Sequence, residues 1–108
     1  MSAWNDHDLD RIAQHYADDV VLYAETVVTR WGRPDGCLRG KDEVVEHFRR
    51  GLELAPDLHF YLEAVLGSPD GFAVVYEREN GHLVCDAVVV NDEGRGKEVR
   101  VYSVNRKG

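Results

Sequence analysis

Four apolar stretches in the second half of the chain, separated by turn-forming residues, constrain the fold more than any other feature. The stretches are rich in β-branched and aromatic residues and cover residues 59–66, 72–79, 83–90 and 98–105. Ser68-Pro69-Asp70-Gly71 separates the first two stretches, and Asn80-Gly81, a strong hairpin signal, separates the second from the third. Residues 91–96 can close a longer hairpin between the last two. We therefore expect an antiparallel meander of four strands.

Asn80 and Gly81 also predict how the second and third strands pair. A two-residue turn there would place Glu79 opposite His82 and Val75 opposite Asp86. The two faces of the third strand carry Val84, Asp86, Val88 and Val90 on one side and Leu83, Cys85, Ala87 and Val89 on the other. Both faces are apolar, whereas an antiparallel sheet commonly leaves one face to solvent. We therefore expect Asp86 to be buried, and a second copy of the chain to cover the outer face in a homodimer.

The first half of the chain carries two helical patterns. Residues 8–20 place apolar side chains on one helical face, at Leu9, Ile12, Ala13, Tyr16, Ala17 and Val20. Residues 20–31 are richer in β-branched and aromatic residues, which favours a short strand. After Gly40, a repeat of Val44, Phe48 and Leu52 predicts a second helix, which Pro56 ends. Helices followed by a meander indicate an α+β fold in which the helices cover one face of the sheet.

Length, composition and charge limit the class of protein. A chain of 108 residues with 44% hydrophobic and 31% charged residues is expected to fold as a single domain spanning residues 1–108. The formal net charge of -7 repels phosphate backbones, so nucleic acid is not expected as a partner. No apolar run has the length of a signal peptide core or a membrane span, so we expect a cytoplasmic protein with no membrane partner.

The sequence contains no recognisable metal or cofactor motif. Cys37 and Cys85 lie far apart, without Cys-x-x-Cys spacing, and the five histidines do not form a His-Glu-x-x-His pattern. Gly32, Gly36 and Gly40 are spaced as turns and precede no Gly-Lys-Ser or Gly-Lys-Thr, so no phosphate-binding loop is predicted. We therefore expect neither a metal ion nor another cofactor.

Three motifs carry a resemblance to a known family. They are AWNDHDLD at residues 3–10, HYADDV at residues 15–20, and LRGKD at residues 38–42, where a helix opens. Together with the closing meander they resemble the nuclear-transport-factor-2-like superfamily, especially SnoaL-like polyketide cyclases and ketosteroid isomerases. The resemblance covers nearly the whole chain. It implies a cone-shaped fold, in which N-terminal helices and a strongly curved antiparallel sheet enclose an apolar pocket, commonly in a dimer.

The resemblance also implies roles for individual positions. Asp86, in the strand that enters the last hairpin, falls where the isomerases hold a pocket acid. Their tyrosine donor would fall just before Met1, and their general base would fall at Ala24, which cannot take a proton, although Glu25 is adjacent. Limonene epoxide hydrolases, another branch, carry Arg-x-Asp on this strand, where the present chain has Val84-Cys85-Asp86. Neither steroid isomerisation nor epoxide hydrolysis is therefore expected.

Asp86 is the candidate catalytic residue. A carboxyl group in an apolar pocket has a raised pKa, which allows it to donate or shuttle a proton near neutrality. The alternative is a structural carboxylate satisfied by a neighbouring donor or by solvent. The candidate ligand-binding residues lie on expected pocket faces or beside them; they are Tyr16, Trp31, His47, Val84, Val88, Val101 and Ser103. Ser103 can offer a hydroxyl group, but no histidine is placed to activate it as a nucleophile.

These residues lead to one leading hypothesis and two alternatives. The leading hypothesis is a pocket that binds a small, largely apolar molecule, such as a cyclic metabolite, with Asp86 as acid or base for isomerisation, cyclisation or hydration. One alternative is a non-catalytic domain of the same fold that binds a ligand or associates with a protein, and another is a transport adaptor. The enzyme hypothesis requires at least one further polar group converging on Asp86.

Overall fold

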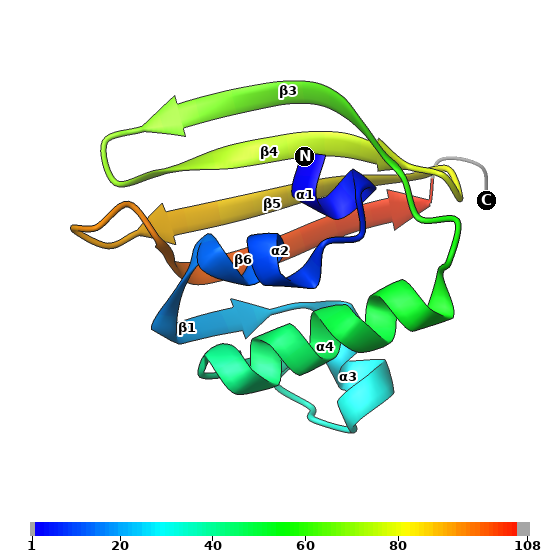
Figure 1. Cartoon of the computed structure of the whole chain (residues 1–108), viewed down its shortest axis with the longest axis horizontal. Coiled ribbons are helices and arrows are strands. Elements are labelled where there is room, and N and C mark those ends of the chain that lie inside the picture. Colours follow the sequence, from blue (N-terminus) through cyan, green and yellow to red (C-terminus); the bar gives the residue numbers. More distant parts are fainter. Residues whose placement is uncertain (1, 106–108) are drawn as a thin grey trace.

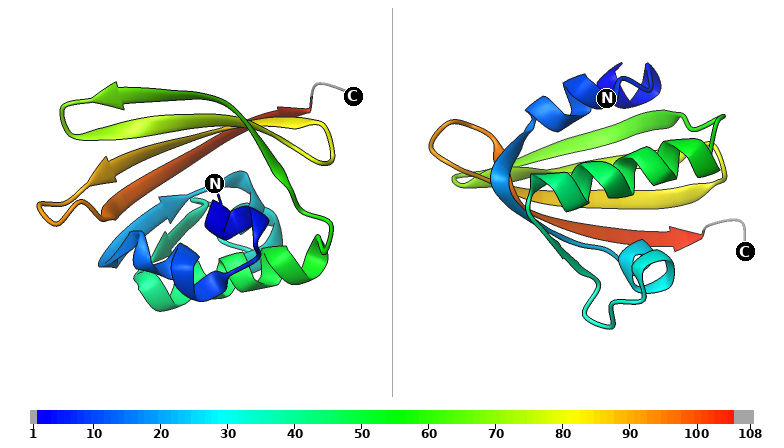
Figure 2. Two further views of the ribbon diagram at one scale, coloured as in Figure 1. Left: turned by 45° about the horizontal axis from the view of Figure 1, so that its top comes forward. Right: turned by 60° about the horizontal axis from the view of Figure 1, so that its bottom comes forward.

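The computed structural model of the chain describes residues 2–105 and shows a six-stranded sheet with helices on one face (Figures 1 and 2). The helices are α1 (Ser2–Asn5), α2 (Leu9–Gln14), α3 (Glu25–Trp31) and α4 (Lys41–Leu54). The strands are β1 (Tyr16–Tyr23), β2 (Cys37–Arg39), β3 (Phe60–Ser68), β4 (Gly71–Arg78), β5 (His82–Val90) and β6 (Gly96–Asn105). The sheet order is β2-β1-β6-β5-β4-β3, and only the β1–β6 pair is parallel. The α+β prediction is confirmed.

The meander and the second helix follow the sequence pattern closely. β3 to β6 are the four predicted strands, paired in chain order. α4 begins after Gly40, whose φ of 89° lies in the left-handed region, and it turns Val44 and His47 into the interior. Asp42 and Glu43 lie in its first turn, where the helix dipole favours negative charge.

The structure corrects the predictions for residues 8–31. α2 ends at Gln14, so Tyr16, Ala17 and Val20 lie on strand β1 and not on a helical face. Pairing with β2 and β6 on its two sides stabilises β1, which outweighs local helical spacing. The second half of the predicted strand forms α3 instead. Gly32, with φ of 66°, ends this helix in the left-handed conformation.

The register between β4 and β5 also differs from the prediction by one residue. Three residues, not two, separate the strands, because the amide of Gly81 donates to the carbonyl of Arg78 at 2.9 Å and Gly81 has φ of 86°. Val74, and not Val75, therefore lies opposite Asp86. A shift of one residue moves every side chain of a strand to the other face, so Tyr76 shares a face with Asp86.

Two groups of buried side chains form the core on the inner, helix-covered face of the sheet. The first lies between β1, β2, α3, α4 and β6 and contains Val20, Leu22, Ala24, Val27, Leu38, Val44 and Val99. The second contains Leu58, which precedes β3, together with Phe60 of β3, Tyr76 of β4 and Val84 of β5. None of the helices in residues 2–105 is long and apolar enough to cross a membrane.

Candidate functional site

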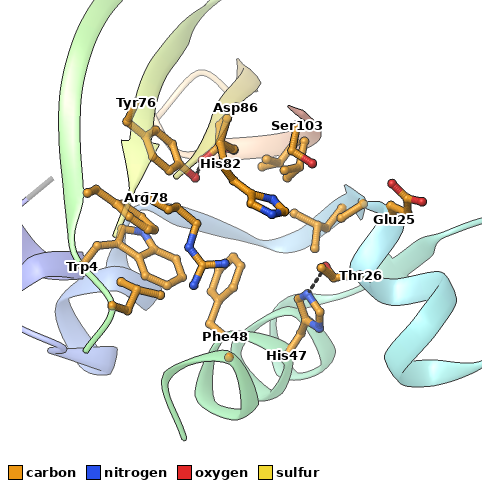
Figure 3. Close-up of a pocket in the computed structure, with 18 of the residues that line it drawn as sticks. Trp4, Glu25, Thr26, His47, Phe48, Tyr76, Arg78, His82, Asp86 and Ser103 are labelled. Carbon is orange, nitrogen blue, oxygen red and sulfur yellow. Dashed lines mark hydrogen bonds between the residues drawn. The ribbon is translucent and has the colours of Figure 1, made fainter. Parts of the chain in front are cut away.

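A cavity of about 450 Å³ lies between the inner face of the sheet and the helices (Figure 3). Its wall is formed by Trp4, Tyr16, Leu22, Ala24, Glu25, Thr26, Thr29, Arg30, His47, Phe48, Gly51, Leu58, Phe60, Tyr76, Arg78, Asn80, His82, Val84, Asp86, Val99, Val101 and Ser103. Buried wall residues such as Leu22, Tyr76 and Val99 mark its deep end, and exposed ones such as Thr29 and Asn80 mark its mouth. The volume is that of a pocket for a small molecule.

Asp86 lies on the cavity wall in the middle of β5, between Val74 of β4 and Val101 of β6. The hydroxyl of Tyr76 donates to Asp86 Oδ2 at 3.0 Å. Asp86 Oδ1 is inaccessible and has no hydrogen-bond partner among residues 2–105, although the residue as a whole keeps some exposed surface. Burial raises the pKa of Asp86 from 3.8 to about 6, and the hydrogen bond from Tyr76 limits the rise. The direction of this pKa shift is the one predicted from the sequence.

Two phenol groups accompany this carboxyl. Burial raises the pKa of Tyr76 far above its usual value, and the charge of Asp86 and the hydrogen bond to it add to the rise. Burial, followed by the charge of Asp86, also raises the pKa of Tyr16, and a hydrogen bond with Trp4 counteracts part of it. Both phenols therefore remain protonated near neutral pH, and Tyr76 donates its hydroxyl proton to Asp86.

Aromatic rings line much of the deep end. The ring of Trp4 packs edge-on against Phe48, with centroids 4.8 Å apart, and lies 5.3 Å from Phe60. Phe60 also stacks on Tyr76 at 4.2 Å, and Tyr16 lies 5.4 Å from Phe48. These rings give an apolar part to the wall of the cavity that Asp86 also lines, and apolar surroundings solvate a charged carboxylate poorly.

His47 of α4 lies on the helical side of the cavity and forms hydrogen bonds with two residues of α3. It is only 6% exposed, and its Nδ1 accepts a hydrogen bond from Trp31 Nε1 at 3.1 Å. The imidazole proton must therefore be on Nε2, which lies 3.1 Å from Thr26 Oγ1 and donates to it. Burial, followed by the positive charges of Arg30 and Arg50, lowers the pKa of His47 to about 4, so the ring is neutral near pH 7. The hydroxyl proton of Thr26, on the cavity wall, is left for another acceptor.

The structure brings most of the sequence candidates to this cavity. Asp86, Tyr16, His47, Val84, Val101 and Ser103 all line it. Trp31 lies outside the wall and contacts His47 through its indole nitrogen, and Val88 packs against the first core cluster. Sequence analysis missed Thr26, Arg30, Tyr76, Arg78 and His82 as wall residues. Tyr76 and Arg78 lie two residues apart and share one face of β4. The correct register puts that face on the side of Asp86, so it would have identified both as wall residues.

The described residues provide no metal centre. In residues 2–105, no group of three or more His, Cys, Asp or Glu side chains is placed to hold a metal ion. Cys37 is buried, and Cys85 lies on the outer face of β5, on the side opposite Asp86.

Comparison with known families identifies the class of protein that this fold and cavity define. The SnoaL-like domain family matches residues 1–107. The chain therefore belongs to the SnoaL-like family of the nuclear-transport-factor-2-like superfamily, as the sequence motifs predicted. No curated protein matches the chain.

Solved structures agree with this assignment. A SnoaL-like protein of unknown function from Burkholderia thailandensis is 35% identical, with a TM-score of 0.90 over 95% of this chain and 86% of that one. A candidate polyketide cyclase, IdmH from Streptomyces antibioticus, is 18% identical, with a TM-score of 0.77 over 96% and 86% of the two chains. A candidate isomerase of the SnoaL-like family from Agrobacterium tumefaciens is 18% identical, with a TM-score of 0.72 over 95% and 89%. The last two show likeness of fold alone.

Proposed function

We propose that the cavity binds a small, largely apolar cyclic molecule and that Asp86 transfers a proton to or from it, in an isomerisation, cyclisation or hydration. One observation carries the proposal: the Asp86 carboxyl lies on the cavity wall, with one oxygen bonded to Tyr76 and the other buried without a hydrogen-bond partner among residues 2–105. Tyr76 and Tyr16 supply the further polar groups beside this carboxyl that an acid-base site requires. The names of the IdmH and Agrobacterium structures, a cyclase and an isomerase, point to the same kinds of reaction.

The chemistry follows from the pKa of the carboxyl. With a pKa of about 6, Asp86 is mostly ionised at pH 7 but still close enough to that pH to work as a general base. The Asp86 carboxylate can take a proton from a carbon next to a ligand carbonyl, and the electron pair of the C–H bond moves into the enolate. The protonated carboxyl then returns the proton to another carbon of the ligand, which completes an isomerisation. A phenol hydroxyl such as that of Tyr16 can stabilise the enolate oxygen.

A hydrogen–deuterium exchange assay tests this proposal without knowledge of the natural substrate. Cyclic ketones such as 2-tetralone are incubated with the protein in D2O, and proton NMR follows the loss of the proton next to the carbonyl. The wild type should accelerate exchange, and Asp86→Asn should lower the acceleration by about 100-fold or more, because the amide cannot accept the proton.

Asp92→Asn is the matched control, because it makes the same chemical change in the exposed turn before β6 and should exchange at the wild-type rate. Equal rates for wild type and Asp86→Asn would contradict the proposal. Binding of the ketone without any acceleration would favour a non-catalytic ligand-binding domain. One observation supports that alternative, since the resemblance puts the second acid–base position of the isomerases at Ala24, which lines the cavity without a titratable group.

A homodimer through the outer face of the sheet remains a second prediction. Apolar side chains on that face include Leu66, Tyr102 and Val104, which are all exposed, and the helices of residues 2–105 lie on the other face of the sheet (Figure 2). Tyr102→Glu, at a position that is 58% exposed, should convert a dimer to a monomer in sedimentation at micromolar concentration. Leu54→Glu on α4, at a 68% exposed position, should leave the dimer intact. A monomeric wild type would contradict the prediction.

A cytoplasmic location likewise stays a prediction from the sequence.

A further inference from the structure

We propose that Arg30 and Arg78 at the mouth of the cavity bind an anionic oxygen group of the ligand, a carboxylate or a phosphate. The inference rests on the proposed function, since it requires a ligand in the cavity, and it adds a charged group to the otherwise apolar ligand. Arg30 lies near the end of α3 and Arg78 at the end of β4, so the two side chains reach the cavity from different elements. Figure 3 shows the Arg78 side chain pointing into the cavity, toward Phe48.

Most of the hydrogen-bonding capacity of these two side chains is unused. Among residues 2–105, the Arg30 guanidinium has no hydrogen bond or ion pair. Arg78 makes two long contacts to Glu79, from Nε at 3.4 Å and from Nη2 at 3.3 Å, and its Nη1 has no partner among the same residues. A guanidinium carries five N–H donors in a planar fork that matches a carboxylate or a phosphate.

The charges around the pair favour an anion. Arg30 and Arg78 both line this cavity, and burial followed by the positive charge of Arg78 lowers the pKa of Arg30, as expected for two cations that repel each other. His47 also faces this end of the cavity, but it is held neutral and so needs no counter-charge. The acidic neighbours are Glu79, which contacts Arg78, and Glu25, an exposed residue of the cavity wall. An anionic group placed between the arginines would replace repulsion by two attractions.

Helix α4 contacts one of these arginines. Gly51 lies inside α4. A Cβ atom at this position would lie 3.4 Å from Arg30 Nη1. The guanidinium of Arg30 therefore packs against the helix at Gly51, on the cavity wall.

These contacts predict how a ligand is oriented. The anionic group lies at the mouth, between α3 and the end of β4, and the apolar body lies among the rings of Trp4, Phe48 and Phe60. The carbon that loses its proton then lies deeper, facing Asp86. The ligand class is therefore an apolar cyclic acid or phosphate ester, rather than a neutral hydrocarbon-like molecule.

Calorimetric titration with three probes of one ring system tests the inference. The probes are 2-naphthoate, 2-naphthyl phosphate and the neutral methyl ester of 2-naphthoic acid. We expect the wild type to bind at least one anion about tenfold more tightly than the ester, and Arg30→Gln and Arg78→Gln each to remove most of that tenfold preference. Whichever anion binds more tightly identifies the group as carboxylate or phosphate. Arg49→Gln, on the exposed face of α4, should change nothing.

The outcomes separate this inference from the proposed function. Ester affinity should be unchanged in the Arg30 and Arg78 variants. Arg30→Gln should melt no lower than the wild type, because it removes repulsion without breaking an ion pair, whereas Arg78→Gln also loses the contacts to Glu79. If the ester binds as tightly as both anions, the inference is wrong and the apolar pocket stands. If the variants lose ester and anion binding alike, the arginines are structural and the inference is also wrong. If no probe binds, the ligand-binding function itself fails.

Discussion

Asp86→Asn is expected to gain about 2 kcal/mol of stability relative to the wild type as pH rises from 4.5 to 8, while it loses proton-transfer activity. The direction follows from the pKa of Asp86, which folding raises from 3.8 to about 6. A raised pKa means that the folded state holds the proton more tightly than the unfolded chain does. The stabilising contribution of this carboxyl is therefore present at low pH and is lost as pH rises through about 6.

Chemical denaturation of both proteins at the two pH values measures this change. The amide of the variant also leaves a buried nitrogen with no partner beside Tyr76, but that cost is the same at each pH and cancels in the comparison. Asp92→Asn serves as the control and should show no relative change with pH. A variant that loses stability relative to wild type as pH rises would mean that Asp86 is a stabilised, ionised carboxylate.

His47→Gln should show the opposite pH dependence. Folding lowers the pKa of His47 from 6.5 to about 4, so the folded state disfavours the protonated ring. The stabilising contribution of the neutral ring is complete above pH 6.5 and is lost as pH falls toward about 4. Between pH 7 and 5 the wild type should therefore lose about 2 kcal/mol relative to the variant.

The glutamine variant keeps an uncharged polar group near Thr26 but removes the acceptor of the Trp31 indole N–H, so the variant should be less stable at pH 7. The same denaturation measurements decide the point, with His15→Gln on the exposed linker between α2 and β1 as the control. A stability difference between wild type and His47→Gln that is constant from pH 7 to 5 would show that His47 titrates with its ordinary pKa.

The parts of the fold that the sequence predicts are those with strong local patterns. The four strands of the meander are bounded by turn residues, and α4 combines helical spacing with Gly40 and Pro56 at its ends. Asp86 was predicted to be buried because it interrupts an apolar strand. These features depend on local chemistry and are retained in the folded chain.

The features that sequence analysis missed depend on contacts between distant segments. Tyr16 lies on β1 because β1 pairs with both β2 and β6, and neither partner is adjacent in the chain. The hydrogen bond from Tyr76 to Asp86 depends on one extra residue in the turn at Asn80 and Gly81, which places the tyrosine on the inner face. Arg30 was missed because residues 25–31 were expected to form a strand.

Proton transfer by Asp86 requires a carboxyl group whose pKa lies well above that of an exposed aspartate, so the pKa of Asp86 is the quantity to measure. The measurement is a carbon-detected NMR titration of the side-chain carboxyls, with Asp86→Asn used to assign the Asp86 signal. We expect the Asp86 signal to titrate near pH 6, well above the 3.8 of an exposed aspartate. Titration at or below 3.8 would show that Asp86 is a structural carboxylate and would contradict the account.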